Sequence, residues 1–142
     1  MLTFTGRATR TEVASYALGA LLVSVAVSFV SGLLLDFETR MLLTNALALA
    51  LAAPVPALLA RRLHDQGRSA RWVWLAVFGF AVWAGRTLVS LALGYETRIA
   101  LDKVIWPLDW LVILANTAMI LLIIMPGTAG PNRFGPDPRG RE

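Results

Sequence analysis

One histidine and one neighbouring carboxylate are the residues of this chain most suited to proton transfer. His64 is the only histidine, and Asp65 follows it directly. Such a pair could supply a general base. Asp65 could instead pair with a nearby arginine and stabilise a helix end. Because the sequence shows no nucleophile, base and orienting group as a set, we assign no catalytic residue and expect no enzymatic activity.

Metal and cofactor chemistry is not indicated either. The chain has no cysteine and a single histidine, whereas protein zinc sites combine several such ligands. The absence of cysteine excludes disulfides and thiolate nucleophiles. We therefore predict neither a metal site nor a cofactor.

Basic residues gather in three short polar segments: the residues before 13, the loop 61–71 and the tail 126–142. We call these three segments together the cap. The tail is rich in glycine and proline and cannot continue a helix. Its Gly127–Gly135 stretch could hold an anion through backbone N–H groups, or fold as a compact tail anchored by Phe134. The candidate binding residues of the cap are Arg7, Arg10, Arg61, Arg62, His64, Asp65, Arg68, Asn132 and Arg133.

The elements between these segments are apolar and long. Of 142 residues, 57% are hydrophobic and 15% are charged, and a helix needs about 20 apolar residues to cross a bilayer. The sequence predicts a single integral membrane domain, 1–142, that is an all-α, up-and-down four-helix transmembrane bundle. The predicted spans are residues 13–35, 41–60, 72–94 and 108–125.

Local signals refine these boundaries. Thr9 and Glu12 fit a capping box, in which each side chain caps the other's backbone N–H. Pro54 and Pro56 predict a kink in the second span. We expect a short polar turn at residues 36–40, a helix end at Gly67, a helix start at Ser69 and a short interfacial helix within residues 95–106.

Two charged residues are predicted to pair inside the membrane. Arg86 lies in the third span and Asp109 near the start of the fourth. Adjacent antiparallel helices would place them at similar depth. The pair could form a gate or an ion site, or it could be a structural ion pair. Alternatively, Arg86 could extend its side chain to the outer headgroups.

The distribution of basic residues predicts orientation. The cap contains nine arginines, whereas the other two loops contain Arg40, Arg98 and Lys103. The side richer in basic residues faces the cytoplasm. We expect a multi-pass protein of the bacterial inner membrane with both termini cytoplasmic. Topology and anionic headgroups explain the net charge of +4 more simply than nucleic acid, which we do not expect as a partner.

Three motifs carry a resemblance to a known family: residues 4–12 (FTGRATRTE), 61–69 (RRLHDQGRS) and 127–138 (GTAGPNRFGPDP). In order and spacing they resemble the bacterial inner-membrane family catalogued as domain of unknown function 805. The chain departs from that pattern at Val13-Ala14, where the family usually has an aromatic pair, and at Ser69-Ala70-Arg71-Trp72, where the family usually has Ser-Gly-Trp-Trp. The resemblance implies a four-helix inner-membrane protein and no established activity.

The leading hypothesis is a binding or accessory protein whose cap engages anionic lipid or an acidic surface of a membrane or cytoplasmic protein. The alternative is a small channel or transporter, acting as a homo-oligomer and lined by Pro54, Pro56, Arg86 and Asp109. A lipid-headgroup enzyme using His64 and Asp65 is a third possibility. Finally, the arginines could act only to fix the topology of the chain in the membrane, and the motifs could act only to join the helix ends.

Overall fold

Four helical segments are long and apolar enough to cross a membrane. The computed structural model describes residues 3–140, and in that range it contains no β-strand, only an isolated bridge between Asn132 and Gly135. The predicted all-α, four-span architecture is therefore confirmed. The elements are α1 (Arg10–Leu34), α2 (Phe37–Ala52), α3 (Val55–Asp65), the 3-10 helix η1 (Ala70–Val73), α4 (Trp74–Leu93), α5 (Tyr95–Ile105) and α6 (Pro107–Ile124).

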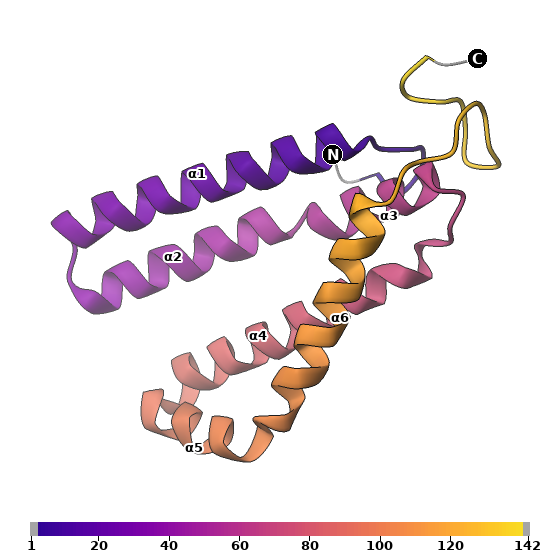
Figure 1. Cartoon of the computed structure of the whole chain (residues 1–142). Helices are drawn as coiled ribbons and strands as arrows, with labels where there is room; N and C mark the ends of the chain where they lie inside the picture. Colours follow the sequence, from indigo (N-terminus) through magenta and orange to yellow (C-terminus); the bar gives the residue numbers. More distant parts are fainter. Residues whose placement is uncertain (1–2, 141–142) are drawn as a thin grey trace.

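The helices form two antiparallel hairpins that meet at one end. α1 packs on α2, α4 packs on α6, and α3 contacts both α1 and α6. The hairpins diverge with distance from α3. At the far end of the second hairpin, α5 joins α4 to α6 (Figure 1). Both ends of the described chain lie near α3, so the three cap segments share this end, which we call the cap end. The predictions for the terminal residues, and Arg141 of the tail, fall outside the described range.

The second span is broken into two helices at its prolines. α2 ends at Ala52, and α3 begins at Val55 after Pro54. Each proline lacks a backbone N–H and crowds the preceding turn, so the helix cannot continue straight through residues 53–56. The predicted kink is confirmed, and it turns α3 toward the other hairpin.

The helix ends follow the sequence signals with two differences. Thr9 accepts a hydrogen bond from the Glu12 N–H at 3.1 Å. The Glu12 carboxylate, however, pairs with Arg61 instead of accepting from the Thr9 backbone N–H. The reciprocal half of the predicted capping box is therefore wrong. Residues 37–40, predicted as a turn, already belong to α2. The connection is that short because Asp36 caps α2 by accepting from the Thr39 N–H.

Burial is concentrated at the cap end. One buried cluster contains Leu59, Ala60, Leu63, Val73 and Met119, and a second contains Ala8, Val13 and Leu58. Most other apolar side chains on the spans are exposed in the isolated chain. A bilayer is as apolar as leucine and removes the need to bury them. The tightly packed part of this fold therefore lies around α3, where it positions the polar groups of the cap.

Candidate functional site

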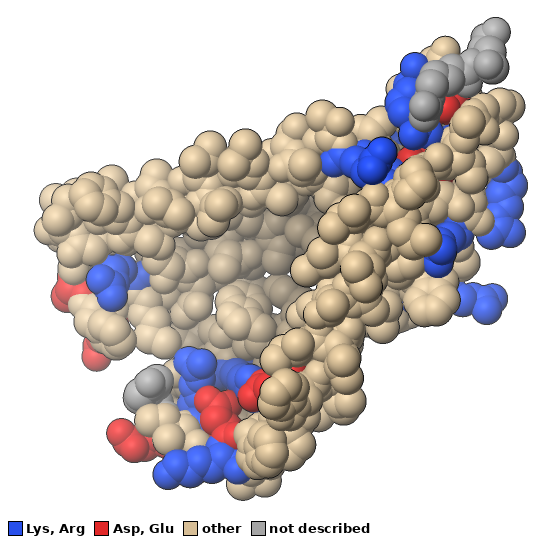
Figure 2. Space-filling model, viewed as in Figure 1, with Lys and Arg blue, Asp and Glu red and all other residues tan. Residues whose placement is uncertain are grey.

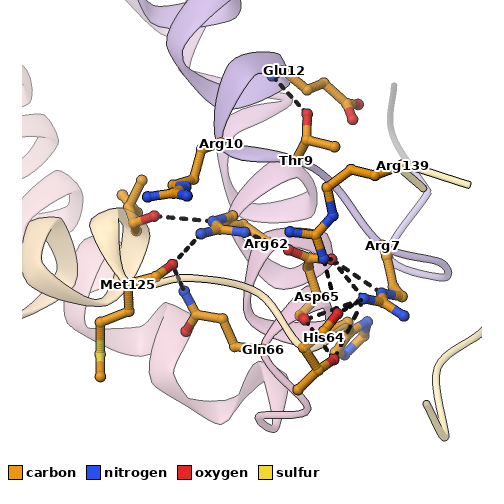
Figure 3. Close-up of polar contacts among 12 residues, drawn as sticks. Arg7, Thr9, Arg10, Glu12, Arg62, His64, Asp65, Gln66, Met125 and Arg139 are labelled. Atoms are coloured by element: carbon orange, nitrogen blue, oxygen red, sulfur yellow. Dashed lines mark hydrogen bonds and ion pairs between the residues drawn. The ribbon is translucent and has the colours of Figure 1, made fainter. Parts of the chain in front are cut away.

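A buried carboxylate joins the three cap segments. Asp65 ends α3 and has no exposed surface. Its Oδ1 accepts from Nε and Nη2 of Arg7 at 3.1 and 2.9 Å, and its Oδ2 accepts from Nη1 of Arg62 at 2.5 Å (Figure 3). The backbone oxygen of Asp65 accepts from the Thr128 N–H at 2.8 Å. One residue thus binds the N-terminal segment, the helix that carries it and the tail.

The tail adds further ion pairs to this arrangement, through Arg139 and Asp137. Arg139 lies 3.4 Å from Oδ1 of Asp65 and 2.8 Å from Oδ1 of Asp137. Its hydrogen bond to Asp137 raises the pKa of Arg139 above the usual arginine value, so the group stays charged. Arg7 also lies 3.9 Å from Asp137. We call Arg7, Arg62, Asp65, Asp137 and Arg139 the Asp65 cluster.

The buried arginines of this cluster bind groups of the protein itself. The side chains of Arg7 and Arg62 are each 1% exposed. Arg7 also donates to the carbonyl oxygens of Thr128 and Gly130, both at 2.7 Å. Charges buried this deeply require partners on nearly every donor. Arg7 and Arg62, predicted as binding residues, therefore stabilise the cap from within.

The end of α6 is closed by side chains of the cap. The last carbonyl groups of a helix have no partner within the helix. Those of Leu122, Ile123, Ile124 and Met125 each accept a hydrogen bond from Gln66, Arg62 or Arg10. Two of these donors are cationic, which suits the negative end of the helix dipole. This role of Gln66 and Arg62 was not predicted, because no local sequence pattern indicates which helix end they reach.

The tail folds back on the loop after α3. Nδ2 of Asn132 donates to the His64 carbonyl at 3.0 Å. The Phe134 ring stacks on the His64 ring at 3.9 Å between centroids, as expected for an anchor. The His64 Nδ1 faces the carbonyl of Gly6 at 3.2 Å, so it carries the proton and donates it. His64 and the Asp65 carboxylate thus make separate contacts, an arrangement that suits a structural role better than a base with its orienting group.

Position 127 requires glycine, which was not predicted from the sequence. A Cβ there would overlap Oδ2 of Asp65. The predicted anion-holding loop does approach an anion, but that anion is the Asp65 carboxylate of the same chain. The arginines supply the charge for it, and the loop supplies carbonyl acceptors and space. The Gly127-Thr128 pair in the sequence indicated a loop that another group could approach closely. The sequence did not show that the Asp65 carboxylate would fill the space beside Gly127.

Other cap arginines remain on the surface. Arg10, Arg71 and Arg133 are exposed, and Arg61 and Arg68 are partly exposed. Arg133 donates to the Gly67 carbonyl at 3.1 Å and lies over the Phe134 ring. Figure 2 shows basic side chains on the outer surface of the cap end. These arginines are accessible from outside the protein, whereas the side chains of Arg7 and Arg62 are not.

Arg86 and Asp109 form the predicted pair at the opposite end. Nη1 of Arg86 lies 2.6 Å from Oδ1 of Asp109, and its Nε lies 2.9 Å from Asp102 of α5. Asp102 also pairs with Arg98 at 3.6 Å. The contribution of Asp102 was not predicted. These ion pairs join α5 to α4 and α6, so a structural role is enough to explain the charged Arg86 in the third span. They lie apart from Pro54 and Pro56.

Among residues 3–140, no three histidine or acidic side chains lie close enough to hold a metal ion. The fold and site define a class: a helical membrane protein whose two hairpins are joined by a polar cap around one buried aspartate. The chain belongs to the family of proteins of unknown function DUF805, whose family model matches residues 1–136. No curated protein matches the chain. No solved structure matches it either.

Proposed function

We propose that this chain is a binding protein of the bacterial inner membrane whose cap faces the cytoplasm and holds anionic lipid headgroups. The observation that carries the proposal is the charge of the cap. It contains nine arginines and four acidic residues, so it carries a net charge of +5, whereas the rest of the chain carries −1. The Asp65 cluster uses three of the arginines internally, and an excess remains on the surface.

The surface arginines lie where headgroups would be. Arg71 precedes Trp72 and Trp74, which are 49% and 71% exposed at the start of the third span. Tryptophan side chains at a helix end favour the interface between hydrocarbon and headgroups. Arg68 and Arg133 lie close to the same loop. A basic cluster next to a membrane helix attracts anionic lipid by about 1 kcal/mol per charge.

The test compares lipid binding to the wild type and to a triple variant, Arg68→Gln/Arg71→Gln/Arg133→Gln. Native mass spectrometry would count dioleoyl phosphatidylglycerol and dioleoyl phosphatidylcholine bound to the detergent-solubilised protein. Three lost charges are worth about 3 kcal/mol, so the preference for phosphatidylglycerol should fall on the order of 100-fold. The control, Arg40→Gln/Lys103→Gln, removes two charges from the opposite end and should keep the preference.

Two results would overturn the proposal. In one, the triple variant keeps the wild-type preference. In the other, its lipid binding is unchanged but an acidic protein that co-purifies with the wild type is lost, which would assign the surface to protein binding. Thermal unfolding of the triple variant should match the wild type, because its three side chains lie outside the Asp65 cluster.

A further inference from the structure

An apolar cleft separates the two hairpins next to the cap. One part has a volume of about 550 Å³ and lies between α1, α2, α3 and α6. A second part, of about 470 Å³, lies between α2, α3 and α4. The two parts share Ala52, Val55, Leu59 and Ala76 in their walls, so they lie next to each other between the hairpins. Figure 2 shows the hollow between the hairpins.

The cleft is as deep as one leaflet of a bilayer. Its lining on α1 runs from Val13 to Ser24. At 1.5 Å per residue, this stretch is about 16 Å long. Half of a hydrocarbon core of about 30 Å is about 15 Å. The space therefore begins at the cap and ends near the middle of the membrane.

The lining suits a hydrocarbon chain. Small side chains, including Ala17, Ala20 and Ala48, leave the room, and Met119 and Ile120 form the α6 wall. Three polar residues line it, Tyr16, Ser24 and Asn116, and the side chains of Tyr16 and Asn116 are turned to the protein. Tyr16 donates its hydroxyl to the Leu51 carbonyl at 2.5 Å. The Asn116 amide lies against the backbone of Gly79, at 2.8 Å from the position of a Cβ there.

The mouth of the cleft carries a positive charge. Arg10 lies one turn before Val13 and donates to the Ile124 carbonyl at 3.2 Å, so it bridges the ends of α1 and α6 next to the lining residues Val13 and Ile123. Arg10 is exposed, and a guanidinium has five N–H donors. It stands beside the Asp65 cluster, whose three arginines outnumber its two aspartates. The mouth is therefore suited to a phosphate group.

From these observations we infer that the cleft holds one acyl chain of an anionic phospholipid from the leaflet at the cap end, with its phosphate bound by Arg10. An unfilled apolar space loses the dispersion contacts of its walls. The lipid is the ligand that supplies both an apolar chain of one-leaflet length and a negative charge at its end. This site uses Arg10 and not Arg68, Arg71 or Arg133, which carry the proposed function, so either proposal can fail alone.

The first test fills the cleft. Ala20→Trp puts a large ring into the lining, and its control, Ala14→Trp, adds the same ring to the exposed side of α1. Native mass spectrometry with dioleoyl phosphatidylglycerol should detect one tightly held lipid in the wild type and in Ala14→Trp. Ala20→Trp should reduce it at least tenfold. Arg10→Gln, which can still donate to Ile124, should keep a bound lipid but lose the preference for phosphatidylglycerol over phosphatidylcholine.

A second measurement needs no variant. A phosphatidylglycerol with a diazirine in the middle of one acyl chain, reconstituted with the wild type, should cross-link to Tyr16, Ala20 or Met119 more than to Leu18 or Leu22 on the outer side of α1. Equal labelling of both sets would overturn the inference. So would a folded Ala20→Trp protein that keeps its lipid, or a wild-type dimer that Ala20→Trp separates, which would assign the cleft to a second copy.

Discussion

Gly127 lies directly against the carboxylate of Asp65, with no room for a Cβ between them. A substitution to alanine must displace either the tail or the buried carboxylate, and both are held by several hydrogen bonds. We expect Gly127→Ala to lower the midpoint of thermal unfolding in detergent clearly. The control is Gly19→Ala in α1, where a Cβ meets no atom within 4 Å. It should leave the midpoint unchanged or raise it slightly, and equal effects of the two would contradict the contact.

Removing the charge of Asp65 should be more damaging than removing any surface charge. Asp65→Ala leaves Arg7 and Arg62 buried without their carboxylate. Breaking a buried pair on one side costs about 3–5 kcal/mol. Glu12→Gln removes the partly exposed partner of Arg61 and should cost at most about 1 kcal/mol. Unfolding of both variants by denaturant in mixed micelles would measure the difference, and similar losses would show that the Asp65 cluster is dispensable.

The contact between α4 and α6 depends on another glycine. Gly79 is buried, and a Cβ at this position would lie 2.8 Å from Nδ2 and 3.0 Å from Oδ1 of Asn116. Gly79→Leu should separate the two helices and cost about 1–3 kcal/mol, the usual range for overpacking. Gly85→Leu places the same side chain in open space on the same helix. A disulfide or cross-link between cysteines on α4 and α6 would form readily in Gly85→Leu and poorly in Gly79→Leu.

The start of α2 should respond to acid. The N–H and hydroxyl of Thr39 both donate to the Asp36 carboxylate, and these hydrogen bonds lower the pKa of Asp36 below its usual value. The pKa of Asp36 is lower in the folded state than in the unfolded state. The ionised Asp36 carboxylate therefore stabilises the start of α2 at pH values above the unfolded-state pKa. This stabilisation is lost as the pH falls through the folded-state pKa. The protection of the Thr39 amide from hydrogen exchange, relative to its intrinsic rate at each pH, should fall in that acidic range. Asp36→Asn should remove this pH dependence, while its side chain still caps the start of α2. An unchanged pH profile of the Thr39 protection would argue against an ionised Asp36 at the helix start.

The proposed orientation can be tested with single cysteines, because the chain has none. Thr3→Cys and Gly140→Cys should be protected from a membrane-impermeant maleimide in intact spheroplasts, whereas Lys103→Cys should react. All three should react after the membrane is permeabilised. Labelling of Thr3→Cys and Gly140→Cys from the outside would reverse the orientation, and labelling of only one of them would contradict four spans.

The number of spans and the meeting of the cap segments were predictable from the sequence. Long apolar runs fix the spans, since the bilayer requires about 20 residues each. An even number of spans brings the ends of the chain to the same side. The pairing of Arg86 with Asp109 was also predictable, because adjacent antiparallel helices give residues of similar depth few other partners.

The interior of the cap was not predictable in the same way. Arg7, Asp65 and Arg139 are far apart in the chain, and only the folded tail shows that they meet. Nothing in the local sequence distinguishes Arg62, which is buried, from Arg61, which is partly exposed. That choice depends on the face that α3 turns toward α6 after the break at Pro54. The cleft likewise depends on the angle between the hairpins, which sequence periodicity does not encode.

The Asp65 cluster also links folding to the success of membrane insertion. Its members come from the first, middle and last parts of the chain, so it is completed only after Arg139 has been synthesised. If one apolar segment failed to insert, the tail would emerge on the opposite side of the bilayer from Arg7 and Asp65. The buried carboxylate would then lack the tail's share of its contacts, and a misinserted chain would carry an unfinished, unstable end that cellular proteases could recognise.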